Sequence, residues 1–456
     1  MHTPMRATPK SGRSDAPVRP RRFVLAVLGL GTAAVLTAAC TMLPAGKPAP
    51  ATPAASPAPA AAPRPTATAP APAPAPTPAA APVAAAPPPP PPPILPFDDA
   101  VLSAANNLFE KAQLPPQGRF TLVIDPLIDG LTGMQTQSTQ AMGARIVKLV
   151  ESKFPRYQVR EFSAASVQQG PLVLIGTFTG VNAQRKTEGK REAYRICLAL
   201  ADLKTGKLVS KGLAFASTEG VDPTPLAFFR DAPATTEDGA TLGYIRTCQG
   251  TKAGDPIHPQ YIDRIVTAAT IAEAIDAYDE RKYADALTLY ETARAAPGGE
   301  QLRVFTGLYL TNLRLGRTSA ASSAFGDIVQ QGLTSKRLGI KFLFRPGTAA
   351  LWTDPRAGPV PYPIWVEQIA RNADQRQSCL EVVGHTSATG PEPLNERLSL
   401  LRAEVVRTQL LREKPALEKR LIASGMGSRE TLVGNARDDA SDALDRRVEM
   451  KVIGGC

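Results

Sequence analysis

Histidine is nearly absent from this sequence, and aromatic residues are few. Among 456 residues there are three histidines, His2, His258 and His385, and aromatic residues make up 5% of the chain. Metal centres and nucleophilic triads draw on histidine, and neither kind of spacing surrounds these three. The basic residues, which give a net charge of +11, are scattered without interleaved aromatics. We therefore expect no catalytic residues, no metal, no cofactor and no nucleic-acid partner.

Cysteine is also sparse, with five residues and no CxxC motif. Apart from Cys40, the four that remain are Cys197, Cys248, Cys379 and Cys456. In an oxidising compartment four thiols allow three pairings. Proximity in the sequence favours Cys197 with Cys248 and Cys379 with Cys456 as domain staples, and free buried thiols are the alternative.

The first 39 residues have the layout of a secretory signal, in which basic residues precede an apolar run at 23–39. The end of this run is similar to a lipoprotein processing site, with Cys40 as the lipidated residue, although Thr37 stands where such sites usually have Leu. Thr41 after the cysteine favours the outer membrane. Two alternatives stay open. Cleavage before Cys40 without lipidation would give a soluble periplasmic protein, and an uncleaved run of about 17 residues would be at the short limit for a membrane anchor.

Proline and alanine dominate residues 40–96, where Lys47 and Arg64 are the charged residues. Such a composition does not bury a core. Its prolines favour extended polyproline II at about 3.1 Å per residue, so the segment could reach on the order of 150 Å. We interpret it as a semi-rigid linker, and a disordered spacer is the alternative.

Residues 97–258 are predicted to form an α/β domain. Apolar residues recur at helical spacing over 101–112, and apolar runs at 120–124 and 172–178 suit buried strands. A helix with Ser138 as its cap is expected between these strands. Runs at 194–203 and 208–216, with a Gly-containing turn between them, then predict a β-hairpin. The order of elements loosely resembles the small α/β domains of CsgG- and TolB-N-terminal-like envelope proteins.

Two carboxylates, Asp125 and Asp129, follow the first of these strands. Paired carboxylates at a strand end could act as acid and base in a hydrolase of the cell wall. The favoured alternative is a turn that uses Asp, Pro and Gly for its geometry.

Residues 259–335 are predicted to be helical, with a pattern that resembles tetratricopeptide repeats. The stretch Tyr283–Ala293 has the alternation of small and large residues found in the second helix of such a repeat, and a second unit follows it. Two units are short of the usual three, so we expect them to lean on a neighbouring domain. Helical pairs of this kind bind protein partners, and a helical spacer is the alternative.

From residue 336 onward, strand and helix signals alternate in the order β-α-β-α-β-β, which predicts a mixed sheet with helices on one face. Motifs at 384–390, 395–406, 425–427 and 445–449 occur in the order seen in OmpA-like domains. The resemblance covers 336–456. The predicted fold class is therefore multidomain α+β: an N-terminal α/β domain, a short TPR-like helical segment and a C-terminal OmpA-like mixed-sheet α/β sandwich.

One helix of this C-terminal domain carries the candidate site. Leu394, Leu398, Leu401 and Val405 are predicted to bury one stripe of the helix, and Asn395, Ser399 and Arg402 to line a second face beside it. The planar guanidinium of Arg402 can hold a carboxylate with two hydrogen bonds.

The resemblance implies that Arg402 binds the diaminopimelate carboxylate of a peptidoglycan stem peptide, with Thr386, Ser387, Asn395 and Ser399 around it. In the family an Asp stands at the position of Ser387 and holds the ammonium group. A hydroxyl supplies no charge, so weaker or altered binding is expected, unless Glu392 compensates.

The resemblance further implies that at least one of Arg446 and Arg447 pairs within the domain, while His385 is expected to be structural.

Together these features predict a non-enzymatic envelope lipoprotein at the periplasmic face of the outer membrane. It would bind peptidoglycan non-covalently and tether the outer membrane, or a partner complex, to the wall. The alternative is an accessory subunit of an envelope assembly or secretion machine, which uses its TPR-like and α/β domains to bind proteins.

Overall fold

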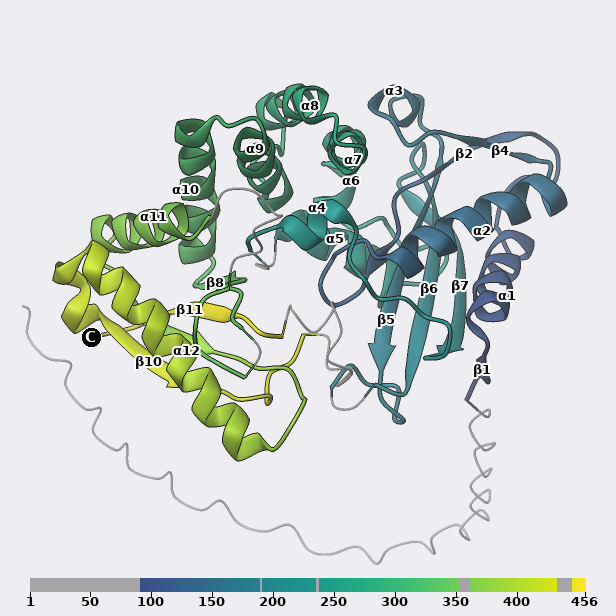
Figure 1. Cartoon of the computed structure of the whole chain (residues 1–456). Helices are drawn as coiled ribbons and strands as arrows, with labels where there is room; N and C mark the ends of the chain where they lie inside the picture. The colour runs from purple at the N-terminus through teal and green to yellow at the C-terminus, as the bar shows by residue number, and fades with distance from the viewer. Residues whose placement is uncertain (1–90, 189–190, 235–237, 346, 353–360, 433–444) are drawn as a thin grey trace, which may run out of the picture. The chain divides into compact units, whose positions relative to one another are not determined.

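The computed structural model describes residues 91–188, 191–234, 238–345, 347–352, 361–432 and 445–456 (Figure 1). The predicted signal, Cys40 and residues 40–90 of the predicted linker lie outside these ranges. The predicted end of the linker at residue 96 is wrong, because Ile94–Leu95 form a strand that pairs with the large sheet described next. The described residues belong to one compact unit. Within the ranges described, no helix combines the length and the apolar character needed to cross a membrane.

A seven-stranded sheet occupies the first part of this unit, in the order β1-β7-β6-β5-β2-β4, with β3 paired to β5. β5 runs antiparallel to β6 and β6 antiparallel to β7, whereas β1, β2, β3 and β4 join through parallel pairings. The strands are β1 (Ile94–Leu95), β2 (Phe120–Ile124), β3 (Ile128–Asp129), β4 (Tyr157–Arg160), β5 (Leu172–Val181), β6 (Ala193–Asp202) and β7 (Lys207–Ser217).

Helices cover both faces of this sheet, which is why all ten residues of β5 are buried. One face packs against α1 (Phe97–Glu110) and α2 (Gln137–Lys153), through residues such as Leu108 and Ile146. The other face packs against the helices that follow the sheet, through residues such as Tyr244 and Ile265. These are α5 (Gly239–Cys248), α6 (Pro259–Ile262) and α7 (Ile265–Asp279), and the remaining short helices are α3 (Ala164–Val167) and α4 (Ala227–Asp231).

The predicted strands and the hairpin of this region are confirmed, and Gly206 has the positive φ that the hairpin turn requires. The predicted cap of α2 is wrong. Thr136 is the N-cap of a capping box: its hydroxyl accepts from the backbone N–H of Thr139, and the hydroxyl of Thr139 accepts from the backbone N–H of Thr136. The hydroxyl of Ser138 instead accepts a hydrogen bond from the backbone N–H of Asp222 at 2.8 Å.

Four longer helices follow in sequence and pack pairwise: α7, α8 (Tyr283–Ala295), α9 (Leu302–Arg314) and α10 (Thr318–Thr334). The helical character of 259–335 is thereby confirmed, while its assignment to tetratricopeptide repeats stays a prediction. Gly307 lets α9 approach the ring of Tyr290 on α8, because a Cβ there would overlap that ring.

The C-terminal sheet has four strands in the order β10-β9-β11-β8, with β10 parallel to β9 and β11 antiparallel to both β9 and β8. This is the mixed sheet that the sequence predicts. Its elements are β8 (Arg337–Ile340), α11 (Tyr362–Gln375), β9 (Cys379–Gly384), α12 (Glu392–Glu413), a 3-10 turn η1 (Pro415–Arg420), β10 (Leu421–Gly425) and β11 (Val448–Ile453).

The helical segment and the C-terminal sheet share one hydrophobic core. The indole N–H of Trp365 on α11 donates to the hydroxyl of Tyr309 on α9 at 2.7 Å, and Trp365 stacks on Phe325 of α10. Lys341, after β8, donates its backbone N–H to the carbonyl of Pro233 at 2.8 Å. The OmpA-like segment is therefore packed into the rest of the unit and does not stand apart.

Two disulfides have the pairing favoured by proximity in the sequence. Cys197 on β6 is joined to Cys248 at the end of α5, with Cα atoms 6.1 Å apart. Cys379 at the start of β9 is joined to Cys456, with Cα atoms 5.6 Å apart. The first bond ties the large sheet to a covering helix, and the second ties the C-terminus to the small sheet.

Candidate functional site

The inward face of α12 is polar at its N-terminal end, which is the reverse of the predicted packing. Leu394 and Leu401 are 60% and 48% exposed, whereas Leu398 and Val405 are half-buried, so the predicted leucine stripe is not the buried face of the helix. The face that packs on β9 and β10 consists of Asn395, Ser399, Arg402, Ala403, Val406 and Leu410. The three predicted ligand-binding residues of this helix therefore do lie on one face, but that face is buried.

Two glycines allow this close packing. A Cβ at Gly384, the last residue of β9, would overlap the carbonyl oxygen of Ser399. A Cβ at Gly425, the last residue of β10, would lie 2.7 Å from the carbonyl oxygen of Glu396. Because neither of these end residues carries a side chain, the backbone of α12 packs directly against the ends of β9 and β10. The glycines of the sequence motifs thus have a packing role that explains their position.

Asn395 and Ser399 hold neighbouring loops in place. The amide of Asn395 donates to the carbonyl of Thr389 at 3.2 Å, which fixes the loop before α12. The hydroxyl of Ser399 donates to the carbonyl of Glu396 at 2.8 Å and accepts from the backbone N–H of Gly427 at 2.9 Å. Both side chains form their hydrogen bonds with backbone groups, so in this structure they hold the loops around Arg402 in position.

Thr386 and Ser387 lie in the loop between β9 and α12, next to the inward face of α12, and both are buried. The backbone N–H of Thr386 donates to the carbonyl of Gly427 at 2.9 Å, but its hydroxyl has no hydrogen-bond partner among the residues that the structure describes. The hydroxyl of Ser387 lies 2.8 Å from that of Thr389. Glu392, considered as a substitute for the missing Asp, accepts hydrogen bonds from Ser428.

Arg402 is the charged residue of this buried face, with 2% of its surface exposed. Its Nε donates to the carbonyl of Thr348 at 3.1 Å, and the guanidinium lies over the ring of Phe344. Within the described ranges, its two Nη groups form no hydrogen bond and no carboxylate pairs with it. Burial, and then the charge of Arg446, lower the pKa of Arg402 to about 10. A desolvated cation without a counter-ion is costly, and a bound anion would relieve that cost.

Arg447 and Glu449 form an internal pair beside this site. Arg447 is 3% exposed and donates to the carbonyl of Glu430 at 3.1 Å, and its Nη2 lies 3.5 Å from Glu449. Glu449 also pairs with Arg337 at 2.5 Å. Burial alone would raise the pKa of Glu449, but contacts with His385 and Arg337 and the charge of Arg447 hold it well below its usual range. One of the two motif arginines thus pairs within the domain, as expected.

His385, Glu430 and Glu449 place three potential metal-ligand atoms within 4.8 Å of one another. His385 is fully buried, and burial lowers its pKa, so its imidazole is held neutral. Cations already neutralise both carboxylates, because Glu449 pairs with two arginines and Glu430 lies 3.5 Å from Lys451. The cluster is therefore an ion-pair network in which arginine and lysine side chains already contact both carboxylates.

Asp125 and Asp129 have separate roles. One oxygen of Asp129 accepts hydrogen bonds from the backbone N–H groups of Leu131 and Thr132 at 3.0 and 2.8 Å, so it shapes the turn. Asp125 is buried and accepts a hydrogen bond from the hydroxyl of Tyr261 at 2.6 Å. Burial raises the pKa of Asp125 to about 7. The geometry supports the turn interpretation of Asp129 and gives no pairing with Asp125 for acid and base chemistry.

Residues 343–444 match the OmpA family, so the chain carries an OmpA-like domain at its C-terminus. A 73-residue stretch is 38% identical to outer membrane porin F of Pseudomonas fluorescens, which is 16% of this chain and 22% of that protein.

Two solved structures are similar to about a quarter of the chain. The peptidoglycan-associated lipoprotein of Burkholderia pseudomallei is 22% identical over 26% of this chain and 92% of its own, with a TM-score of 0.21. The cell wall anchor of the T6SS from Pseudomonas aeruginosa is 19% identical over 28% of this chain and 96% of its own, with a TM-score of 0.22.

Proposed function

We propose that this chain is a non-enzymatic cell-envelope protein whose OmpA-like domain binds peptidoglycan non-covalently. In this proposal Arg402 binds the carboxylate of a diaminopimelate side chain, and the linker with a lipid on Cys40 joins this contact to the outer membrane. The observation that carries it is the desolvated guanidinium of Arg402, which lacks a counter-ion among the described residues. A guanidinium with two unoccupied Nη groups can bind one carboxylate with two parallel hydrogen bonds.

The surrounding contacts favour a preorganised site. Asn395 and Ser399 fix the two loops on either side of the inward face, so a ligand would not have to order them. The unpartnered hydroxyl of Thr386 adds one group that a polar ligand could satisfy. With Arg402 only 2% exposed, ligand entry requires the carbonyl of Thr348 to move away from the guanidinium.

Co-sedimentation of the full chain with purified wall sacculi tests the proposal. We expect Arg402→Ala to reduce binding at least tenfold. Arg397→Ala on the exposed side of the same helix is the matched control and should bind like the wild type. Sacculi with lysine in place of diaminopimelate lack the second carboxylate and should bind weakly. Equal binding of both variants, or of both kinds of sacculi, would count against Arg402 as the carboxylate site.

Substitution of Ser387 gives a second test of the proposed binding site. Ser387 is buried beside Thr389, in the loop that Asn395 holds against α12. A carboxylate there would supply a negative charge opposite the ammonium group of the ligand. Ser387→Asp should therefore strengthen binding to diaminopimelate sacculi several-fold. No gain in a folded Ser387→Asp protein would mean that the ligand ammonium does not reach this loop.

The second candidate function is that of an accessory subunit in an envelope assembly. The shared core of α7–α10 and the C-terminal sheet favours a rigid unit that positions partner-binding surfaces relative to the wall. A pull-down from envelope extract that yields a stable stoichiometric partner would support this function.

A further inference from the structure

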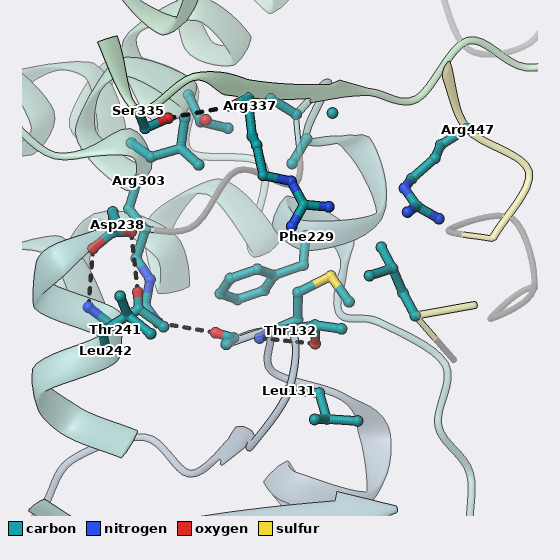
Figure 2. Close-up of a pocket in the computed structure, with 18 of the residues that line it drawn as sticks. Leu131, Thr132, Phe229, Asp238, Thr241, Leu242, Arg303, Ser335, Arg337 and Arg447 are labelled. Carbon is teal, nitrogen blue, oxygen red and sulfur yellow. Dashed lines mark hydrogen bonds between the residues drawn. The ribbon is translucent and has the colours of Figure 1, made fainter. Parts of the chain in front are cut away.

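A half-open cavity of about 210 Å³ lies outside the Arg402 site. Its wall comes from the turn after β3, from α4 and α5, from α9, and from β8 and β11. Figure 2 shows the ring of Phe229 in the middle of this cavity, with Asp238 and Thr241 on one side and Arg337 and Arg447 on the other. Segments that are far apart in the sequence thus meet around one space.

The cavity has an apolar interior. Its lining includes Met134, Phe229 and Leu302, whose surfaces are otherwise almost completely buried, together with Leu242 and Ile245 from α5. Apolar side chains that converge on an open space favour a ligand with an apolar body, because its burial removes surface from water on both sides.

Three arginines reach this cavity, but two of them are already paired. Arg337 and Arg447 both contact the carboxylate of Glu449, at 2.5 and 3.5 Å. Asp238, the other lining carboxylate, is occupied as the cap of α5, because its oxygens accept from the N–H and the hydroxyl of Thr241. These groups are therefore satisfied without a ligand.

Arg303 differs from the other two. It projects from α9, and its Nη2 donates to the carbonyl of Gly133 in the turn after β3 at 2.9 Å. Its guanidinium lies 5.9 Å from the centre of the Phe229 ring. In the described part of the chain it forms no ion pair, although its charge also acts on the buried Asp125, whose pKa burial raises to about 7. Of the three arginines, it is therefore the one that has no carboxylate in direct contact.

We propose that this cavity binds a small monocarboxylic acid with an apolar body, its carboxylate on Arg303 and its body against Phe229, Met134 and Leu302. One unpaired guanidinium matches one negative charge, whereas a dianion would face Asp238 and Glu449. A cationic ligand is repelled by the same guanidinium. The same chemistry is offered by a free acid and by the C-terminus of a peptide that ends in an apolar residue.

Isothermal titration calorimetry on the full chain tests this site with octanoate, octylamine and octanol. We expect octanoate to bind at one site, at least tenfold more tightly than either of the other two. Comparable binding of octylamine or octanol would overturn the proposal, because the charge on Arg303 would then contribute nothing.

Substitutions locate the binding. Arg303→Gln should weaken octanoate binding at least tenfold, Arg303→Lys should retain part of it, and Ala232→Leu should block it by filling the cavity. Arg317→Gln, at an exposed arginine outside the cavity, is the matched control and should bind like the wild type. Should Arg303→Gln fail to fold, the comparison of Arg303→Lys, Ala232→Leu and Arg317→Gln decides the question, since unchanged binding by Ala232→Leu would place the ligand elsewhere.

The two sources of the carboxylate are separated by N-acetyl-Ala-Phe with a free or an amidated C-terminus. Binding of the free peptide but not of the amide assigns the cavity to a chain end, and binding of octanoate alone assigns it to a free acid. Both results support the proposal, and failure of octanoate and of the free peptide to bind overturns it. Sacculi play no part in this experiment, so its outcome is independent of peptidoglycan binding.

Discussion

The guanidinium carbon of Arg402 lies 5.0 Å from the centre of the Phe344 ring. A cation on an aromatic face is attracted by the ring quadrupole, and this attraction offsets part of the cost of burial. It does not neutralise the charge, which is why the α12 face stays electrostatically incomplete without an anion. The contact also holds the guanidinium at a fixed position against the ring.

Replacing Arg402 with Met should increase the stability of the unliganded chain while removing wall binding. An apolar side chain of similar length relieves an uncompensated buried charge but loses the ring contact, so we expect a net gain of about 1 kcal/mol in the free energy of unfolding. Urea denaturation measures it, with Arg397→Met on the exposed face as the control. A loss above about 2 kcal/mol would indicate that Arg402 is a structural residue.

Gly384→Ala should destabilise the chain by about 2–3 kcal/mol, because the new Cβ meets the backbone of Ser399 on α12. Gly143 in α2 is the matched control, since a Cβ there meets no atom within 4 Å. Gly143→Ala should instead stabilise the chain by about 0.5–1 kcal/mol, the helix preference of Ala over Gly. Denaturation curves that shift in the same direction for both variants would contradict the packing described for α12.

Asp125 should make stability depend on pH between about 4 and 7. Its pKa rises from an ordinary value of 3.8 to about 7, so in this range the folded state holds a proton that the unfolded state has lost. Stability from this group is therefore complete below pH 4 and falls as the pH rises to 7, by about 4 kcal/mol at 1.36 kcal/mol per pH unit. Asp125→Asn stays neutral, so it should match the wild type near pH 4 and exceed it at pH 8. Parallel stability curves for the two proteins would show that Asp125 is ionised in the fold.

The two disulfides should differ in their accessibility to a reductant. Cys248 is fully buried and Cys197 nearly so, whereas Cys456 is exposed at the C-terminus. Mild reduction of the native protein, followed by alkylation and peptide mapping, should label Cys379 and Cys456 first. The opposite order of labelling would mean that the edge of the large sheet opens more readily than the C-terminus.

The strands β2, β5, β6 and β7 could be predicted from sequence because their signals are local, whereas the short strands β1, β3 and β4 were not predicted. The apolar runs of β2 and β5 and the Gly-containing turn between β6 and β7 each lie within about ten residues. The order of the C-terminal elements follows in the same way from alternating patterns. Disulfide pairing also followed sequence proximity, since each pair lies within one sheet and its cover.

The orientation of α12 could not be predicted, because hydrophobicity places leucines inside. Here Asn395 and Ser399 face inward, where the carbonyl of Thr389 and the N–H of Gly427 satisfy them. Those partners come from loops whose position only the fold defines. The contact between Asp125 and Tyr261 spans 136 residues and has no local signal either. The cavity around Arg303 was missed for the same reason.

The common core of α9, α10 and α11 has a mechanical consequence for a wall-attached protein. A pull on the OmpA-like segment would be resisted by side chains such as Trp365 and Phe325, across the boundary at residue 336, and no joint there could swing freely. Cutting the chain at that boundary would expose these apolar side chains to solvent, and the fragments are expected to aggregate. If the OmpA-like segment is attached to the wall as proposed, stress from the wall would be transmitted through one continuous packed unit as far as the first sheet.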